Sequence, residues 1–273
     1  MIKNADFGGL KHITINIAAG VLVNVGYRLD ETGQILEKYR ATSEPDFSVS
    51  IDDVEWKNVP QPELSWSSVE LSAIGALIAD KMTNYDRVAL HGSAVAVDGD
   101  GYLFVAPSKI GKSTHAAWWR KLLGDHAVMI NDDMPYLWLR NDTLYLCNNF
   151  DEGKHHLGCN ACVPLKAVFR LVRGDKSALQ KLTMVDAAQV LHESAYQAIV
   201  WATGFIKNSN YISIRKANLI FQAAQLVPFY RLTCCNSYTD AVEAFKVAPE
   251  LFNKIGFLDI EPNLRLKNTG EPE

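Results

Sequence analysis

The chain has 273 residues, of which 48% are hydrophobic and 21% are charged, and its formal net charge is −4. This length can bury a substantial core, either as one large domain or as a core with a small lobe. The negative charge argues against nucleic acid as a partner, because phosphate backbones require basic surfaces. Apolar runs stay shorter than the roughly 18 residues that a membrane helix needs. We therefore expect a cytoplasmic enzyme with no membrane partner.

The N-terminal part of the chain, residues 1–64, alternates short apolar runs with polar turns. Ile13–Ile17 alternates as a strand does, and a second strand is expected after the turn Ala18–Gly20. The polar stretch Gly26–Gly33 is interpreted as another turn. This pattern predicts a small β-rich lobe.

Helical spacing of apolar residues marks four later segments. The first is Ser67–Met82, with Ser67 or Ser68 as its N-cap. The other three are expected at 185–203, 214–226 and 238–248. We divide the chain into the lobe with its helix, a core with the C-terminal helices, and a flexible tail, at residues 1–85, 86–258 and 259–273.

A β-hairpin is predicted in the middle of the chain. The apolar segments Val88–Val97 and Tyr102–Ala106 flank the glycine-containing turn Asp98–Gly101. The second strand leads directly into Ala106-Pro-Ser-Lys-Ile-Gly-Lys-Ser-Thr114, which has the composition of a phosphate-binding loop. The hairpin would therefore place this loop at the end of a strand.

The residue types in this loop suit a triphosphate. Small residues let backbone N–H groups approach the phosphates, Lys112 supplies a positive charge, and Ser113 supplies a hydroxyl for Mg²⁺. The following helix, expected over Thr114–Leu123 and ending at Gly124, adds the positive end of its dipole. The predicted nucleotide contacts are Ala106, Ser108, Lys109, Ile110, Gly111, Lys112, Ser113 and Thr114.

A second buried strand is predicted at Ala127–Ile130, followed by Asn131, Asp132 and Asp133. Ligands of open α/β sheets bind at the carboxyl ends of the strands. We therefore expect both carboxylates at the same sheet edge as the loop. They can hold Mg²⁺, together with Ser113, and can accept a proton from a hydroxyl. The sequence leaves open which aspartate does which.

A hairpin that feeds directly into such a loop resembles the HPr kinase/phosphorylase and phosphoenolpyruvate carboxykinase superfamily. The matching residues are His91–Gly92, Ala106–Ser113 and Asn131–Asp133. The resemblance implies a mixed α/β (α+β) fold. It would have a phosphoenolpyruvate carboxykinase-like P-loop core, with the hairpin before the Walker A loop and the small N-terminal lobe beside it.

Three further segments, Asp151–Leu157, Val163–Phe169 and Arg173–Asp175, resemble a truncated subfamily of bacterial HPr-kinase-like proteins. The resemblance covers roughly residues 86–250 and is strongest over 88–175. It does not extend to the arginine-rich signature of HPr kinase, nor to the metal-binding Lys and His and the oxaloacetate-binding Arg of the carboxykinases. Action on HPr itself and decarboxylation are therefore not expected.

The resemblance also implies roles for individual residues. Lys112 would contact the β- and γ-phosphates, and Ser113 would ligate Mg²⁺. One of Asp132 and Asp133 would ligate or orient the metal, and the other would act as the base. His91 matches the histidine near the catalytic aspartate and would tune its proton affinity.

Two more basic positions are candidates. Lys154, with His155 and His156, is able to face a phosphate or an acidic acceptor, or forms an exposed basic turn. Arg173 either supports the site from behind or lies in a solvated turn.

These residues favour an ATP- and Mg²⁺-dependent kinase that phosphorylates a hydroxyl of a small protein, a peptide or a metabolite. Another nucleoside triphosphate could replace ATP. Two alternatives stay open: a carboxykinase-like enzyme acting on a keto acid, and a non-catalytic nucleotide-binding regulatory module. The oligomeric state, including a homo-oligomer, is also open.

The chain has five cysteines, an odd number that does not suggest a secreted disulfide framework. Cys159 and Cys162 have the spacing of a redox or zinc pair, but no second such pair occurs. Cys234 and Cys235 are adjacent, and Cys147 stands alone. We interpret all five as incidental thiols.

Overall fold

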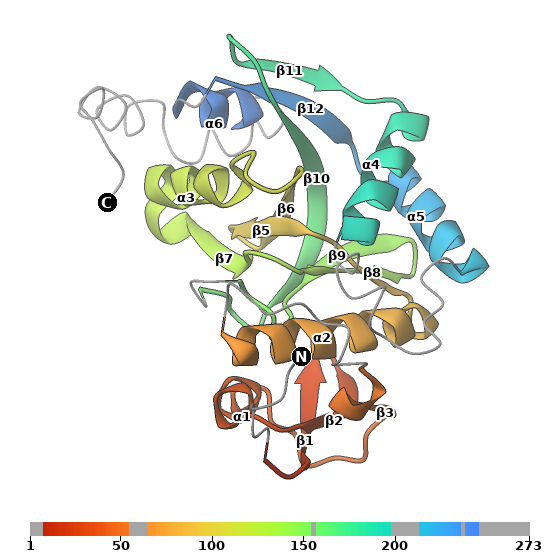
Figure 1. The fold of residues 1–273 in the computed structure, drawn as a ribbon. Coiled ribbons are helices and arrows are strands. Elements are labelled where there is room, and N and C mark those ends of the chain that lie inside the picture. The colour runs from red at the N-terminus through yellow and green to blue at the C-terminus, as the bar shows by residue number, and fades with distance from the viewer. Residues whose placement is uncertain (1–7, 55–64, 154–156, 198–212, 236–237, 246–273) are drawn as a thin grey trace.

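The computed structural model describes residues 8–54, 65–153, 157–197, 213–235 and 238–245. Two sheets, one of three strands and one of nine, make up its β-structure, and helices pack against both of them (Figure 1). The mixed α/β class predicted from the sequence is confirmed. Among the described residues, every helix is too short or too polar to span a bilayer.

The three-stranded sheet lies near the N-terminus. Strands β1 (Lys11–Ile17) and β2 (Val21–Tyr27) form the predicted hairpin around Ala18–Gly20, whose three residues have positive φ angles. Strand β3 (Phe47–Ser50) runs parallel to β2 and leads into the 3-10 helix η1 (Ile51–Asp53). The interpretation of Gly26–Gly33 as a turn is wrong at both ends. Gly26 and Tyr27 belong to β2, and α1 (Asp30–Glu37) begins at Asp30 with two acidic residues in its first turn.

Helix α2 (Trp66–Met82) separates the small sheet from the large one (Figure 1). Its N-cap is Ser65, whose hydroxyl accepts a hydrogen bond of 3.2 Å from the amide of Ser68, so the predicted caps lie two and three residues too late. Ile74 and Ile78 are fully buried in a cluster shared by the small sheet, α2 and the nearest strands of the large sheet. The N-terminal part therefore packs on the rest of the described chain through α2.

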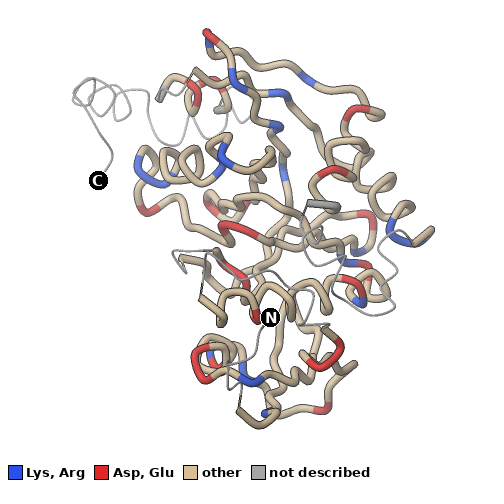
Figure 2. Tube along the Cα trace, viewed as in Figure 1, with Lys and Arg blue, Asp and Glu red and all other residues tan. Residues whose placement is uncertain are grey.

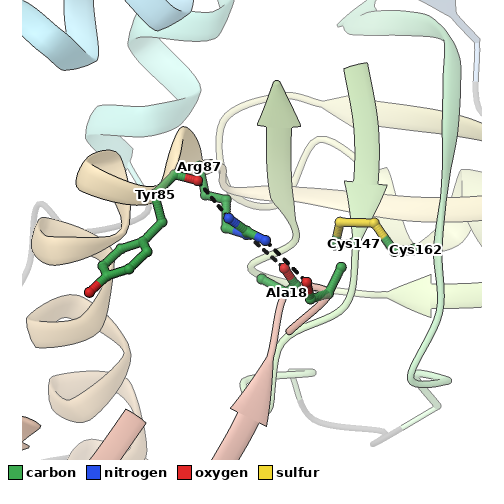
Figure 3. Close-up of a disulfide and its surroundings, with 6 residues drawn as sticks. Ala18, Tyr85, Arg87, Cys147 and Cys162 are labelled. Carbon is green, nitrogen blue, oxygen red and sulfur yellow. Dashed lines mark hydrogen bonds between the residues drawn. A yellow bond between two sulfur atoms is a disulfide. The ribbon is translucent and has the colours of Figure 1, made fainter. Parts of the chain in front are cut away.

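Arg87 ties the β1–β2 turn to the large sheet, just after the 3-10 helix η3 (Thr83–Tyr85). Its guanidinium donates to the carbonyl oxygens of Ala18 at 2.7 Å, Ala19 at 3.1 Å and Tyr85 at 2.6 Å (Figure 3). Burial lowers the pKa of Arg87 to about 10. The left-handed turn residues thus leave carbonyl groups turned toward a buried cation.

The large sheet is organised around one long strand, β10 (Cys162–Arg173). Its first residues pair antiparallel with β9 (Thr143–Cys147). Its later residues pair parallel with β6 (Asp100–Val105) along one edge and with β12 (Phe229–Cys234) along the other. The sheet continues beyond β9 to β8 (Tyr136–Arg140) and β4 (Arg87–Ala89), and beyond β12 to β11 (Ala178–Lys181).

The predicted β-hairpin is formed by β5 (Gly92–Val97) and β6, with a turn at Asp98 and Gly99. The segment expected as one strand from Val88 is two strands, because the chain leaves β4 after Ala89 and enters β5 at Gly92. The free edge of β5 pairs antiparallel with β7 (Ala127–Asn131). The carboxyl ends of β6 and β7 and the start of β5 therefore meet at one edge of the sheet.

Helices cover both faces of the large sheet (Figure 1). Helices α3 (Lys112–Leu123) and α6 (Tyr238–Phe245) pack on one face around Phe104 and Trp119. The 3-10 helix η4 (Gly124–His126) follows α3 directly in the chain. Helices α4 (Met184–Gln197) and α5 (Ile214–Leu226) pack on the other face. The bounds of α5 match the prediction. The predicted continuations of α4 to residue 203 and of α6 to residue 248 lie outside the described residues, as does the predicted tail 259–273.

The interpretation of all cysteines as incidental thiols is wrong for two of them. Cys147 on β9 and Cys162 on β10 face each other in the antiparallel register and form a disulfide (Figure 3). Cys159, Cys234 and Cys235 are free thiols. The spacing of Cys159 and Cys162 along the chain gave no indication of this bond, because the strand register decides which thiols meet.

Candidate functional site

The loop from Ala106 to Gly111 connects the end of β6 to the first turn of α3. Lys109 has φ +66° and Gly111 has φ +111°, so the chain passes through the left-handed region twice. A Cβ added at Gly111 would meet nothing within 4 Å, so its φ angle is the reason for glycine there. These turns bring the loop back over the N-terminus of α3, where backbone N–H groups lack helical partners.

Lys112, the first residue of α3, is buried against this loop and only 8% exposed. Its ammonium group donates a hydrogen bond of 3.1 Å to the carbonyl oxygen of Ala106. Burial lowers the pKa of Lys112, whereas the carboxylates of Asp133 and Asp132 act in the opposite direction. Ser113 and Thr114 are exposed in the first turn of the helix. The lysine thus lies between the loop and the two aspartates.

Asp132 and Asp133 follow β7 directly, at the sheet edge where the loop begins. Strand β5 lies between β7, which leads to the aspartates, and β6, which leads to the loop. The two strands still run in the same direction, because β5 is antiparallel to both. The predicted meeting of loop and carboxylates at one edge therefore follows from this order.

His91 comes to the same edge from the start of β5. Its Nε2 atom lies 3.7 Å from Oδ1 of Asp133, and the next amide, of Gly92, donates to the carbonyl oxygen of Asp133 at 3.0 Å. Burial raises the pKa of the Asp133 carboxyl, an effect that His91 and Lys112 partly offset and Asp132 reinforces. His91 and Asp133 are therefore electrostatically linked.

The two aspartates differ in their contacts. Ser93, buried in β5, donates a hydrogen bond of 2.6 Å to Oδ1 of Asp132 and fixes that carboxylate in place. The side chain of Asp133 is 43% exposed and faces His91. One carboxylate is thus held by the scaffold, and the other is open to a substrate.

Asn131 belongs to the segment Asn131–Asp133 that carries the resemblance, but no role was predicted for it. Its side-chain oxygen accepts hydrogen bonds from the amides of Asp133 at 2.9 Å and Met134 at 2.7 Å. Its NH₂ group donates to Oδ1 of Asn148 and to the carbonyl oxygens of Asn149 and Asp151, at 2.9, 3.2 and 3.0 Å. The available signals were its place in that segment and at the end of an apolar strand, and neither of them predicts these hydrogen bonds.

Through Asn131, the segment after β9 is joined to the turn that carries the aspartates. Gly153, with φ +70°, passes so close that an added Cβ would lie 3.2 Å from the Cβ of Asp133. Desolvation and the nearby charge of Asp133 raise the pKa of Asp151 to about 7, whereas hydrogen bonds from Gly153 and Ser72 lower it. No role was predicted for Asp151, because only the tertiary structure brings it beside Asp133.

The remaining predicted site residues fall into two groups. Lys154, His155 and His156 lie outside the described residues. Arg173, at the end of β10, is exposed and donates a hydrogen bond of 2.8 Å to the carbonyl oxygen of Lys109. Of the two interpretations of Arg173, the geometry therefore favours support of the loop.

A cavity of about 510 Å³ opens beside the loop. Lys109, Gly111 and Thr114 form its wall on the loop side, and Trp118 continues that wall along α3. The opposite wall comes from the ends of β10 and β12 and from the start of α6. The loop therefore has the aspartates on one side and a cavity on the other.

Comparison with known proteins identifies the family. Residues 60–244 match the family model described as SynChlorMet cassette protein ScmC, and the chain belongs to that family. No curated protein matches the sequence. Among solved structures, the HPr(Ser) kinase/phosphatase from Coxiella burnetii matches with 10% sequence identity and a TM-score of 0.35, over 66% of this chain and 99% of that chain.

Proposed function

We propose that this member of the ScmC family is a phosphotransferase that moves a phosphoryl group from a nucleoside triphosphate, with Mg²⁺, to a hydroxyl group. The observation that supports the proposal is the shared sheet edge. A loop at a helix N-terminus, the buried Lys112, and the pair Asp132 and Asp133 all lie there. Phosphoryl transfer depends on such positioning and on charge neutralisation rather than on covalent chemistry by the protein.

The donor phosphates would lie over the loop. The free amides at the start of α3 and the ammonium group of Lys112 would hold the β- and γ-phosphates. Mg²⁺ would take Ser113 and Asp132 as protein ligands. The residues fit this ion, because kinase sites bind it through one or two carboxylates together with substrate phosphates and water. The ion would neutralise charge on the phosphates.

The contacts of the two aspartates support a different role for each. Asp132, held by Ser93, would serve the metal, and Asp133, half-exposed beside His91, would serve as the base. The raised pKa of Asp133 makes it a better proton acceptor than an ordinary surface carboxylate. Asp133 takes the proton of the acceptor hydroxyl, the hydroxyl oxygen bonds to the γ-phosphorus, and the bond to the bridging oxygen breaks. The nucleoside diphosphate leaves.

The acceptor class is tested by incubating the purified protein with γ-labelled ATP, Mg²⁺ and a lysate of the source organism. Label on a peptide or protein band identifies a protein kinase, and label in the small-molecule fraction identifies a metabolite kinase. Release of label as inorganic phosphate alone, unchanged by substitution of Asp133, would contradict transfer and leave a nucleotide-binding module.

The base is tested by Asp133→Asn. We expect a loss of transfer of about 10²- to 10⁴-fold, the usual contribution of a general base, while calorimetry shows that Mg-ATP binding is retained. The matched control is Asp125→Asn, an exposed aspartate in η4, which should keep full activity. Wild-type transfer by Asp133→Asn would refute the assignment.

A further inference from the structure

The cavity beside the loop lies on the opposite side of β6 from the aspartates. The strand order is β7, β5, β6, β10, with β12 on the far edge of β10. Asp132 and Asp133 follow β7, whereas the cavity lies between α3 and the ends of β10 and β12. A molecule that spans the loop from the aspartates would therefore extend into this cavity.

The size and chemistry of the cavity suit a nucleoside. Its volume of about 510 Å³ falls in the range of small-molecule sites. Trp118, half-buried on α3, and Leu171 of β10 give it an aromatic and an apolar surface. The ring of His115 lies edge-on to Trp118, with 6.0 Å between the ring centres, and supports the tryptophan from the side of the core.

The mouth of the cavity is basic. Arg173 and Lys109 line it, and Arg173 is fixed there by its hydrogen bond to the Lys109 carbonyl oxygen. Figure 2 shows further Lys and Arg along β10 and at the two ends of α3, where Arg120 and Lys121 lie in the last turn, away from the loop. An anionic group is thus attracted to the mouth, although the whole chain carries a net charge of −4.

Asp240, the acidic residue of the cavity lining, already accepts hydrogen bonds within the protein. Asp240 has no exposed surface, and its Oδ1 atom accepts hydrogen bonds from Ser177 and from the amide and thiol of Cys235. A carboxylate so engaged has little capacity left to read the N–H groups of a guanine. The walls of the cavity favour stacking over recognition of the base edge.

We infer that this cavity holds the nucleoside of the donor, with its base stacked on Trp118 and its triphosphate directed over the loop toward Asp133. This inference rests on the proposed function. It fixes the direction of the donor: the nucleoside lies at β10 and β12, and the acceptor approaches from the side of β7. Because stacking dominates, adenine and guanine nucleotides bind with affinities within about tenfold of each other.

Calorimetry with Mg-tripolyphosphate, Mg-ATP and Mg-GTP separates the two halves of the site. We expect Trp118→Ala to weaken the binding of both nucleotides about ten- to hundredfold, the usual effect of removing a stacked aromatic ring. The binding of tripolyphosphate should stay unchanged. Trp118→Phe keeps most of the affinity, and unchanged thermal unfolding of each variant shows that the fold is intact. Equal weakening of tripolyphosphate and ATP, or ATP binding no tighter than tripolyphosphate, overturns the inference while the proposed phosphate site stands. Failure of all three ligands to bind overturns the proposed function and the inference with it.

A thiol of the cavity wall gives an independent readout. Cys235 lines the cavity, whereas Cys159 lies beside Glu152, away from it. Mg-ATP should slow alkylation of Cys235 at least fivefold and leave Cys159 unaffected, and Mg-tripolyphosphate should protect neither thiol. Alkylation of Cys235 at the same rate with and without saturating Mg-ATP would place the nucleoside elsewhere.

Discussion

Asn131 organises the turn that carries both aspartates, and its removal is the most direct test of how the site is built. Its side chain is fully buried and takes part in the five hydrogen bonds described above. Two of them are accepted from backbone amides, which can only donate, so they fix the orientation of the amide group. The other three then hold the segment after β9 against this turn.

The magnitude follows from these contacts. Each intramolecular hydrogen bond contributes about 1 kcal/mol net, and a buried partner left unsatisfied costs about 1–3 kcal/mol. Because water can enter beside the half-exposed Asp133 and satisfy some partners, we expect Asn131→Ala to lower the free energy of unfolding by about 3–5 kcal/mol. Asn131→Asp keeps both acceptor contacts but turns a carboxylate toward three oxygen atoms. At neutral pH this variant should lose at least as much free energy of unfolding as Asn131→Ala. The loss should shrink as the pH falls and the new carboxyl is protonated.

Denaturant titrations of the wild type and both variants measure this difference. The matched control is Asn160→Ala, an exposed asparagine of the same segment, which should change stability by less than about 0.5 kcal/mol. A loss below about 1 kcal/mol for Asn131→Ala would refute the reasoning. So would an Asn131→Asp variant as stable as the wild type at pH 7.

Two further predictions concern stability. The disulfide Cys147–Cys162 joins cysteines 15 residues apart and closes a loop that carries Asp151. Substitution of both cysteines by serine should therefore lower the free energy of unfolding by about 3 kcal/mol in denaturant titrations. Equal stability of this variant and the oxidised wild type would contradict the prediction. Burial lowers the pKa of His115 to about 3, so below about pH 6.5 the unfolded chain binds a proton that the native state does not. Stability should therefore fall as the pH drops from 6.5 toward 3, by up to about 1.4 kcal/mol per pH unit from this residue, and His115→Leu should remove that part of the slope. Identical slopes for the two proteins would show that His115 is protonated in the native state.

The sequence determined the local parts of the site. Apolar runs, turn glycines and helix formers predicted the β5–β6 hairpin, the loop that begins at Ala106, α3 with its end at Gly124, and α5. The start of α3 was predicted at Thr114, two residues later than its first residue, Lys112. These features depend on residues a few positions apart, whose φ preferences and side-chain periodicity act within one element. The presence of both aspartates near the loop also followed, because strands that run in the same direction end at the same sheet edge.

The tertiary structure alone decided which distant groups meet. Strand register places Cys147 opposite Cys162, and Ser93 beside Asp132 and not Asp133. The packing of the segment after β9 brings Asp151 near Asp133 and gives Asn131 its partners. Such contacts join residues tens of positions apart, and a shift of one residue in register turns every side chain to the other face of the sheet. No local pattern along the chain encodes that choice, because it is set by how the two faces of the large sheet are covered together.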